Sequence, residues 1–419
     1  MSSTGSPQSI KMVLPRPRRL SGIDMAPAEP ENTQELGATM VSGGVQISKT
    51  RGLTVDGEQH GAIKRDDLRF EPGALGAGAC SVVRLARHTA TNQRYAVKLF
   101  AIFDDAKRRQ LVEEIRTLFS LDCAALVQFH GAYLDGATGK VGVVLDYMDA
   151  GSVEGLINAR RQPFPEKVAA AILYQCCWGL GYLHFERRLH RDVKPGNILL
   201  SSRGEARLSD FGISKALTDE EESAKTMVGT FRYMAPERLR GDAYSFESDV
   251  WAAGMVLLEL LRGDAVFPPS CTPLDLNGAC ERLARDFVAE KLEGVDVSTD
   301  CVDFAEACLR RRAEDRALPD LLLAGPWLAG LDLEGCCVTL APFLAFQLAL
   351  GAAKPCLAAL RGKHVAPDQR DVAARAQAAC ATIASVVGAL LYAGHAPIVF
   401  AACALACAMA SSPLMRLTA

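Results

Sequence analysis

The 419-residue sequence lacks a strong excess of charge of either sign, and its cysteines lack the spacing of a disulfide framework or a zinc site. Its 46 Lys and Arg residues nearly balance 49 Asp and Glu residues, which gives a formal net charge of −3. This balance shows no sign of a nucleic-acid partner or of attraction to acidic substrates. The 14 cysteines are scattered, and neither adjacent pair, Cys176-Cys177 or Cys336-Cys337, has zinc-ligand spacing. We therefore expect reduced thiols in a reducing compartment.

The first part of the chain also lacks a sustained apolar period. Residues 1–65 are rich in Ser, Thr, Gly, Pro and Gln, which predicts a disordered N-terminal tail. Within it, basic residues at positions 11–19 precede apolar side chains at positions 20–25. This order is typical of a docking segment that lies in an acidic groove with apolar pockets. A solvated basic patch and a transit peptide are the alternatives.

The most informative stretch is HRDVKPGNILL, residues 190–200. Asp192 could accept the hydrogen bond of an attacking hydroxyl, Lys194 could neutralise a moving phosphoryl group, and Asn197 could offer its amide oxygen to Mg²⁺. The same groups in the same order resemble the catalytic loop of protein kinases. The alternative, a charged turn before a strand, does not explain seven matching residues.

A glycine-rich stretch, LGAGACSVV, occupies residues 75–83. Gly76 and Gly78 stand where a tight strand turn lets backbone amides approach phosphates, and Ser81 replaces the third glycine of the kinase pattern. One hairpin later a strand ends at Lys98, which could bridge the α- and β-phosphates. Alone, the glycines could belong to an ordinary hairpin turn and Lys98 could be a solvated charge. Their succession in the sequence indicates a nucleotide site.

The segment 104–121 has apolar residues at positions 111, 115 and 118, which predicts a helix with one buried face. Glu114 is the candidate partner of Lys98, since it lies at the position that the resemblance to the kinase αC helix requires. Glu113 remains an alternative on periodicity alone. A buried lysine without a carboxylate would swing away from the phosphates, so we expect the position of this helix to control activity.

Two strands are predicted at 126–133 and 141–148, and a long helix at about 166–186. Leu145 would lie at the back of an adenine pocket, and residues 146–148 would form the hinge whose backbone bonds the base. The order of strands, hinge and helices predicts an α+β, bilobal protein-kinase fold. We expect ATP to be held by Leu75, Gly76, Ala77, Gly78, Ala79, Cys80, Ser81, Val82, Val83, Ala96, Lys98, Leu145, Asp146, Met148 and Leu199.

After the catalytic loop, Asp210 opens the tripeptide Asp-Phe-Gly, where its carboxylate could hold Mg²⁺ across the β- and γ-phosphates. Asn197 is the second expected metal ligand. The kinase resemblance further implies a pair between Glu237 and Arg316 that clamps the large lobe. It also implies that Asp249 ties its helix to the backbone of the catalytic loop.

The strings VGTFRYMAPERL, GISK and DYMDAGS, together with the basic N-terminal segment, resemble the MAP kinase kinases of the Ste group. The resemblance covers residues 70–328. It implies transfer of the γ-phosphoryl group of ATP to Ser or Thr, with Tyr left open, and a MAP kinase as protein substrate, under an upstream activating kinase. The alternatives are another Ste-group kinase, or a pseudokinase scaffold, against which the intact catalytic residues argue.

The activation segment, 210–237, departs from the family pattern. Thr226 occupies the second phosphorylation position, whereas the first falls on the acidic run 220–222. A fixed carboxylate supplies part of the charge that a phosphate would present to Arg191. We therefore expect partly relieved autoinhibition and a response mainly to Thr226, with Ser223 as the other phosphorylation candidate. A solvated acidic loop is the alternative.

The C-terminal segment, 332–419, is rich in Ala, Leu and Cys and does not resemble a kinase. Residues 376–410 contain no Asp, Glu, Lys or Arg, and this length exceeds a membrane span. Gly394, His395 and Pro397 interrupt it, so we expect a pair of soluble helices, with a membrane tail anchor as the alternative. The corresponding location is cytoplasmic, with the nucleus as a further compartment and membrane attachment through the tail as the alternative.

Overall fold

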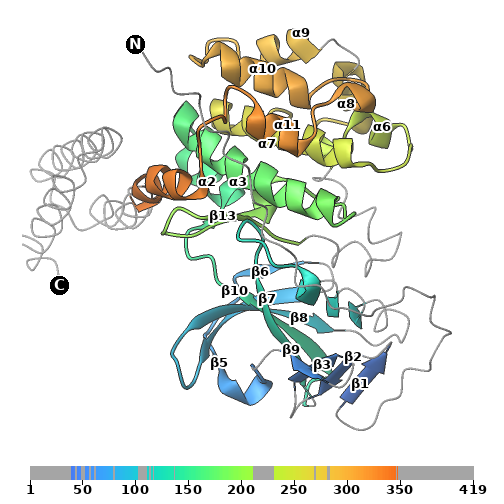
Figure 1. Cartoon of the computed structure of the whole chain (residues 1–419), viewed down its shortest axis with the longest axis vertical. Coiled ribbons are helices and arrows are strands. Elements are labelled where there is room, and N and C mark those ends of the chain that lie inside the picture. The colour runs from blue at the N-terminus through green and yellow to red at the C-terminus, as the bar shows by residue number, and fades with distance from the viewer. Residues whose placement is uncertain are drawn as a thin grey trace, which may run out of the picture.

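The protein has a β-rich small lobe and a helical large lobe (Figure 1), so the predicted bilobal α+β architecture is confirmed. The computed structural model describes residues 39–42, 45–48, 52–55, 58–60, 63–78, 81–101, 111–112, 115–116, 118–135, 137–210, 231–268, 270–280, 284–345 and 347.

The small lobe is built on an antiparallel sheet of six strands in the order β5-β7-β8-β10-β9, with β6 paired to β7. Alternation of buried and exposed side chains along β8 places its inward face in the core. The predicted strands at 126–133 and 141–148 are observed as β9 and β10, joined by a tight turn. The strands are β5 (Leu68–Phe70), β6 (Gly76–Ala77), β7 (Ser81–His88), β8 (Arg94–Ala101), β9 (Phe129–Asp135) and β10 (Lys140–Asp146).

A second antiparallel sheet precedes this lobe in the chain, and its strand residues between positions 39 and 60 correct the prediction of disorder at those positions. Its strands β1 to β4 follow one another in chain order, and β2 and β3 contact β9. Ile47 and Leu53 have no exposed surface. The strands are too short for apolar periodicity to be visible, and packing on β9 stabilises them instead. They are β1 (Thr39–Ser42), β2 (Val45–Ser48), β3 (Gly52–Val55) and β4 (Glu58–His60).

The large lobe is organised around two buried helices, α3 and α7, which contact each other. Pro165 precedes the first residue of α3, and Ser245 and Gly263 flank α7 as caps. The predicted helix at 166–186 is thus confirmed. The helices are α2 (Val153–Arg160), α3 (Glu166–Phe185), α6 (Pro236–Leu239), α7 (Phe246–Arg262), α8 (Pro273–Cys280), α9 (Ala284–Lys291), α10 (Thr299–Cys308) and α11 (Pro319–Ala324).

A small sheet, β11-β12-β13, follows the hinge and carries the catalytic loop between α3 and β12. Short 3₁₀ helices complete the fold. These elements are β11 (Gly151–Ser152), β12 (Ile198–Leu200), β13 (Ala206–Leu208), η1 (Arg65–Asp67), η2 (Pro195–Asn197), η3 (Phe231–Tyr233) and η4 (Ala313–Asp315).

The two lobes are joined by backbone hydrogen bonds as well as by the hinge. Val127 N donates to the carbonyl oxygen of Leu208 and Leu208 N donates to that of Ala125, both at 2.9 Å. Leu126 and Leu208 form an isolated parallel bridge. The segment before β9 is therefore fixed to β13 of the large lobe.

The predicted helix at 104–121 is described only in part. Residues 111–112, 115–116 and 118–120 are helical, and Leu111, Ile115 and Leu118 are buried as expected. Both glutamates that could pair with Lys98, Glu113 and Glu114, lie outside the described residues. The choice between them stays a prediction.

The C-terminal extension begins with a helix, Leu333–Ala345, which lies beside α2 and β13 and is the unlabelled orange helix in Figure 1. Among the described residues, one helix, α3, is long and apolar enough to cross a membrane, but most of it is buried inside the large lobe. The proposed helical pair or tail anchor at 376–410 lies outside the described residues. It remains a prediction, as does the cytoplasmic location.

Candidate active site

The catalytic loop brings Asp192, Lys194 and Asn197 together on η2 and the residues before it. The Asp192 carboxylate accepts hydrogen bonds from Lys194 Nζ and Asn197 Nδ2, both at 2.9 Å. Asn197 Nδ2 also donates to the Asp192 carbonyl oxygen at 2.8 Å. Pro195 at the start of η2 presets the turn that makes these contacts. Both side-chain donors bind the same oxygen, Oδ2, and so fix the orientation of the carboxylate for proton acceptance.

Asp249 on α7 anchors this loop, as the kinase resemblance implied. Its carboxylate, which has no exposed surface, accepts the backbone N–H groups of His190 and Arg191 at 2.9 Å each. Tyr244 Oη donates to it at 2.9 Å, and His184 Nε2 lies 3.1 Å away. Burial alone would raise the pKa of Asp249, but the His184 hydrogen bond and the charges of both histidines hold that pKa below its usual value.

Lys98 on β8 of the small lobe contacts the large lobe. Its Nζ donates to Asp210 Oδ1 at 2.7 Å, and only 4% of Lys98 is exposed. Ser209, the residue before Asp210, donates its backbone N–H to the Asn197 carbonyl oxygen at 2.9 Å. Asp210 itself has a left-handed backbone with φ of 60°, a conformation that non-glycine residues adopt rarely and often at functional sites. Lys98, Asn197 and Asp210 thus converge at one place.

The donor set at this place fits Mg²⁺. Among the described residues, both hydrogen bonds of the Asn197 side chain use its nitrogen, which leaves its side-chain oxygen for a cation. Asp210 adds a carboxylate. Oxygen ligands of this kind suit Mg²⁺, which completes its shell with water and phosphate oxygens. The described part of the chain contains no cluster of three or more His, Cys, Asp or Glu side chains suited to a metal.

The glycine-rich hairpin forms β6 and the start of β7, with Gly76 opposite Val83 and Ala77 opposite Val82. At the turn, Gly78 N donates to the Ser81 carbonyl oxygen at 2.8 Å. A Cβ added to Gly76 would meet no described atom within 4 Å. Protein packing therefore does not explain this glycine, whereas close approach of a phosphate would.

The remaining predicted contacts to ATP fall on both lobes. Ala96 on β8 lies opposite Leu145 at the end of β10, and Leu199 lies on β12 of the large lobe. Leu75 and Val82 belong to the glycine-rich hairpin, and Met148 belongs to the hinge. Ala79 and Cys80 lie outside the described residues, as do Glu114, Thr226, Ser223 and the acidic run 220–222.

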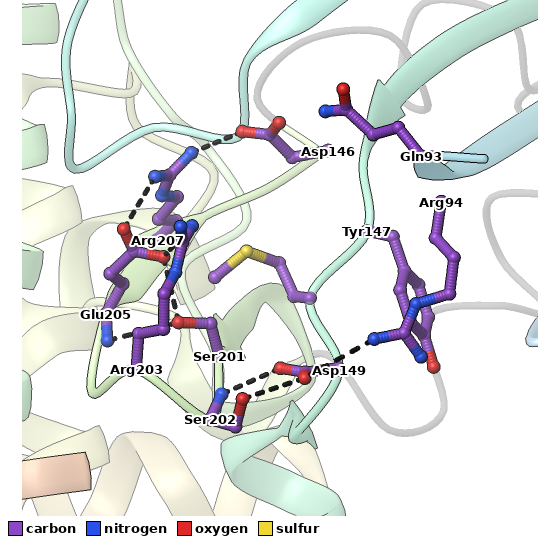
Figure 2. A pocket seen from close by; sticks show the side chains of 11 residues that line it. Gln93, Arg94, Asp146, Tyr147, Asp149, Ser201, Ser202, Arg203, Glu205 and Arg207 are labelled. Carbon is purple, nitrogen blue, oxygen red and sulfur yellow. Dashed lines mark hydrogen bonds and ion pairs between the residues drawn. The ribbon is translucent and has the colours of Figure 1, made fainter. Parts of the chain in front are cut away.

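The hinge is held by a polar cluster around Asp146 that the sequence did not reveal, and Figure 2 draws its contact with Arg207. Arg207 on β13 forms an ion pair with Asp146, and His130 Nε2 lies 2.7 Å from the other carboxylate oxygen. Gln128 N also donates to this carboxylate, at 3.2 Å. Burial would raise the pKa of Asp146, but the His130 hydrogen bond and the Arg207 charge hold it below its usual value.

A cavity of about 270 Å³ lies between hinge residues 146–149 and the residues around the β12–β13 turn (Figure 2). It shares Asp146 and Met148 with the predicted nucleotide site. Asp149, next in the hinge, accepts hydrogen bonds from Ser202 N and Oγ at 2.7 and 2.8 Å and pairs with Arg94 at 3.7 Å. The lining residues are Gln93, Arg94, Asp146, Tyr147, Met148, Asp149, Ser201, Ser202, Arg203, Glu205 and Arg207.

The predicted clamp of the large lobe is present. Arg316 NH1 and NH2 donate to the two carboxylate oxygens of Glu237, each at 2.7 Å. Ser248 Oγ on α7 donates to the same carboxylate at 2.8 Å. This buried, bidentate ion pair links α6, α7 and the segment after α10.

Comparison with known proteins agrees with this geometry. Residues 71–328 match the protein kinase domain family. Mitogen-activated protein kinase kinase 3 of Arabidopsis thaliana is 36% identical over 264 residues, which cover 62% of this chain and 50% of that protein. The dual specificity mitogen-activated protein kinase kinase dSOR1 of Drosophila melanogaster is 34% identical over 300 residues, covering 66% and 74%.

Mitogen-activated protein kinase kinase 2 of Arabidopsis thaliana is 32% identical over 265 residues, covering 62% of this chain and 72% of that protein. The chain thus spans half the length of the first of these relatives and nearly three quarters of the other two. The matched region contains the catalytic loop, the hinge and the clamp described above. The chain belongs to the protein kinase family and is a MAP kinase kinase-like member of it.

Proposed function

We propose that this kinase transfers the γ-phosphoryl group of ATP to Ser and Thr, and also Tyr, hydroxyls in the activation loop of a MAP kinase. The observation that carries the proposal is the chain of contacts that brings Asp192, Asn197, Asp210 and Lys98 together between the two lobes. Phosphoryl transfer needs positioning and charge neutralisation more than covalent chemistry, and this arrangement provides both.

Each of these side chains has a separate role in the proposal. Asp192 accepts the hydrogen bond of the substrate hydroxyl and so aims its oxygen at the phosphorus. Lys194, 2.9 Å from Asp192, lies where it can neutralise the phosphoryl group during transfer. Lys98 holds the α- and β-phosphates. Mg²⁺, bound by Asn197 and Asp210, would neutralise charge on the β- and γ-phosphates.

The protein substrate is proposed from two observations. Relatives that match over most of their own length are named as kinases of MAP kinases, one of them with dual specificity. The basic and apolar segment at 11–25 has the pattern of a docking peptide for an acidic groove. We infer by the same argument that an upstream kinase activates this chain at Thr226, with Ser223 as a second acceptor.

The test is mass spectrometry of a kinase-dead MAP kinase after incubation with the full chain, ATP and Mg²⁺. We expect phosphate on the Thr and Tyr of its activation loop. The matched control is Asp192→Asn, which keeps the shape of the side chain and removes its charge. Equal inactivity of wild type and control, with ATP bound by neither, would overturn the proposal and favour a scaffold.

A further inference from the structure

The helix Leu333–Ala345 lies beyond the end of the kinase domain match at residue 328, yet it packs tightly on the large lobe. Cys336, Leu340 and Leu344, spaced four apart, are buried, whereas Val338 on the same helix is 68% exposed. The Phe343 ring lies 5.5 Å from that of Phe164 before α3. A helix with one buried stripe is a fixed part of the lobe.

The same helix touches the turn between β12 and β13, backbone against backbone. Gly204 in this turn has φ of 86°, and a Cβ on it would lie 2.7 Å from Ala341 N and closer still to the Cys337 carbonyl oxygen. Only glycine allows both the conformation and the approach. From the other side, Gln175 on α3 donates to the Gly204 carbonyl oxygen at 3.3 Å and accepts from Ala206 N at 2.9 Å. The turn is therefore held between α3 and the extension helix.

The opposite end of this turn holds the hinge (Figure 2). Ser202 donates its backbone N–H and its hydroxyl to the two carboxylate oxygens of Asp149. Asp149 in turn pairs with Arg94 of β8, whose guanidinium lies over the Tyr147 ring at 4.9 Å. Contacts thus run without a break from the extension helix, through Gly204 and Ser202, to the hinge and the small lobe.

We propose that the helix Leu333–Ala345 is a positioning element for the adenine of ATP. It holds the β12–β13 turn against Asp149 and thereby fixes hinge residues 146–148, whose backbone groups bond the base. The inference rests on the proposed function, since it needs ATP at the hinge. A ligand held by a few backbone hydrogen bonds is sensitive to small displacements of those groups. The Ser202 side chain and Asp149 transmit the position of the helix but do not touch the nucleotide.

The test compares Leu340→Asp, which places a charge in the buried stripe, with Val338→Asp, which places the same charge on the exposed side. Calorimetry on the full-length chain gives the Kd of ATP and of inorganic tripolyphosphate, which has no adenine. We expect Leu340→Asp to weaken ATP by about 5-fold and to leave tripolyphosphate unchanged. KM for ATP should rise by the same factor while kcat at saturating ATP stays constant. Val338→Asp should match wild type in every measurement.

A second variant keeps the test decisive if Leu340→Asp unfolds the helix's surroundings. Asp149→Ala removes the contact with Ser202 and should reproduce the selective loss of ATP affinity. Adding Leu340→Asp to it should cause no further loss, because both act through one route. A lowered Tm with unchanged Kd for ATP in either single variant would show that the helix only stabilises the lobe. Failure of wild type to bind ATP would instead overturn the proposed function.

Discussion

Asp192 orients a hydroxyl through the charge of its carboxylate and through the position in which Lys194 and Asn197 hold it. A substitution that removes the charge and keeps the shape tests the charge by itself. In Asp192→Asn the charge is lost, and one of the two acceptor oxygens is replaced by an NH₂ group, which donates and cannot accept. We expect kcat to fall by about 10²- to 10⁴-fold. The Kd of ATP, measured by calorimetry, should be unchanged because Asp192 does not contact the nucleotide in the proposal. A variant with full kcat would remove Asp192 from the mechanism.

In the buried Glu237–Arg316 pair, removal of one partner lowers the stability of the fold because it leaves the other partner without its hydrogen bonds. Arg316→Ala leaves the Glu237 carboxylate buried without its guanidinium, and we expect the free energy of unfolding in urea to fall by about 3–5 kcal/mol. The matched control is Arg312→Ala, because Arg312 also pairs with a glutamate, Glu314, but is 72% exposed. That change should leave the free energy of unfolding the same within error. Equal effects of the two changes would contradict the role of the clamp.

At the scale of elements, the sheet β1–β4 adds a packed layer to the small lobe. Leu53 on β3 has no exposed surface. We therefore expect Leu53→Ala to lower the free energy of unfolding by about 2–5 kcal/mol, the cost of a buried cavity. Gln46→Ala on β2, at a half-buried polar position, is the control and should cost little. If chemical denaturation showed no difference between them, the sheet would not be part of the cooperative small lobe.

The catalytic elements could be predicted from the sequence because their roles are encoded in short contiguous strings. The loop 190–197 and Asp210 carry recognisable chemistry at fixed spacing, and the structure brings them together. The hinge contacts could not be predicted. Arg207 lies 61 positions from Asp146 and Ser202 lies 53 from Asp149, and no local pattern connects such partners. Strands of three or four residues, as in β1–β4, likewise leave too short a pattern to detect.

At the scale of the whole molecule, buried carboxylates link stability to pH. Burial would raise the pKa values of Asp146, Asp249 and Glu237, but their partners hold all three below the ordinary values. A lowered folded-state pKa means that the unfolded chain takes up protons first. The stabilisation is therefore complete above the unfolded pKa of about 4 and is lost as pH falls through the folded values.

We accordingly expect Tm, measured by calorimetry, to fall steeply as the pH drops below about 4. Asp146→Asn should make this fall shallower, since one of the linked carboxyls is gone. The exposed Asp303→Asn is the control and should leave the slope as in wild type. A Tm that did not depend on acid pH would mean that these pairs contribute nothing to folding.

The backbone bonds between residues 125–127 and Leu208 have a mechanical consequence. Among the described residues, the main chain connects the lobes at two places, this junction and the hinge after β10, and a body attached at two places turns about the line through them. Lobe opening is then a hinge rotation about one axis, and the lobes do not separate. Because β7 lies two strands away from β10 in the sheet, the β6–β7 hairpin travels further than β10 for the same angle. A nucleotide would then leave at the glycine-rich edge while the base end of its site stays almost still.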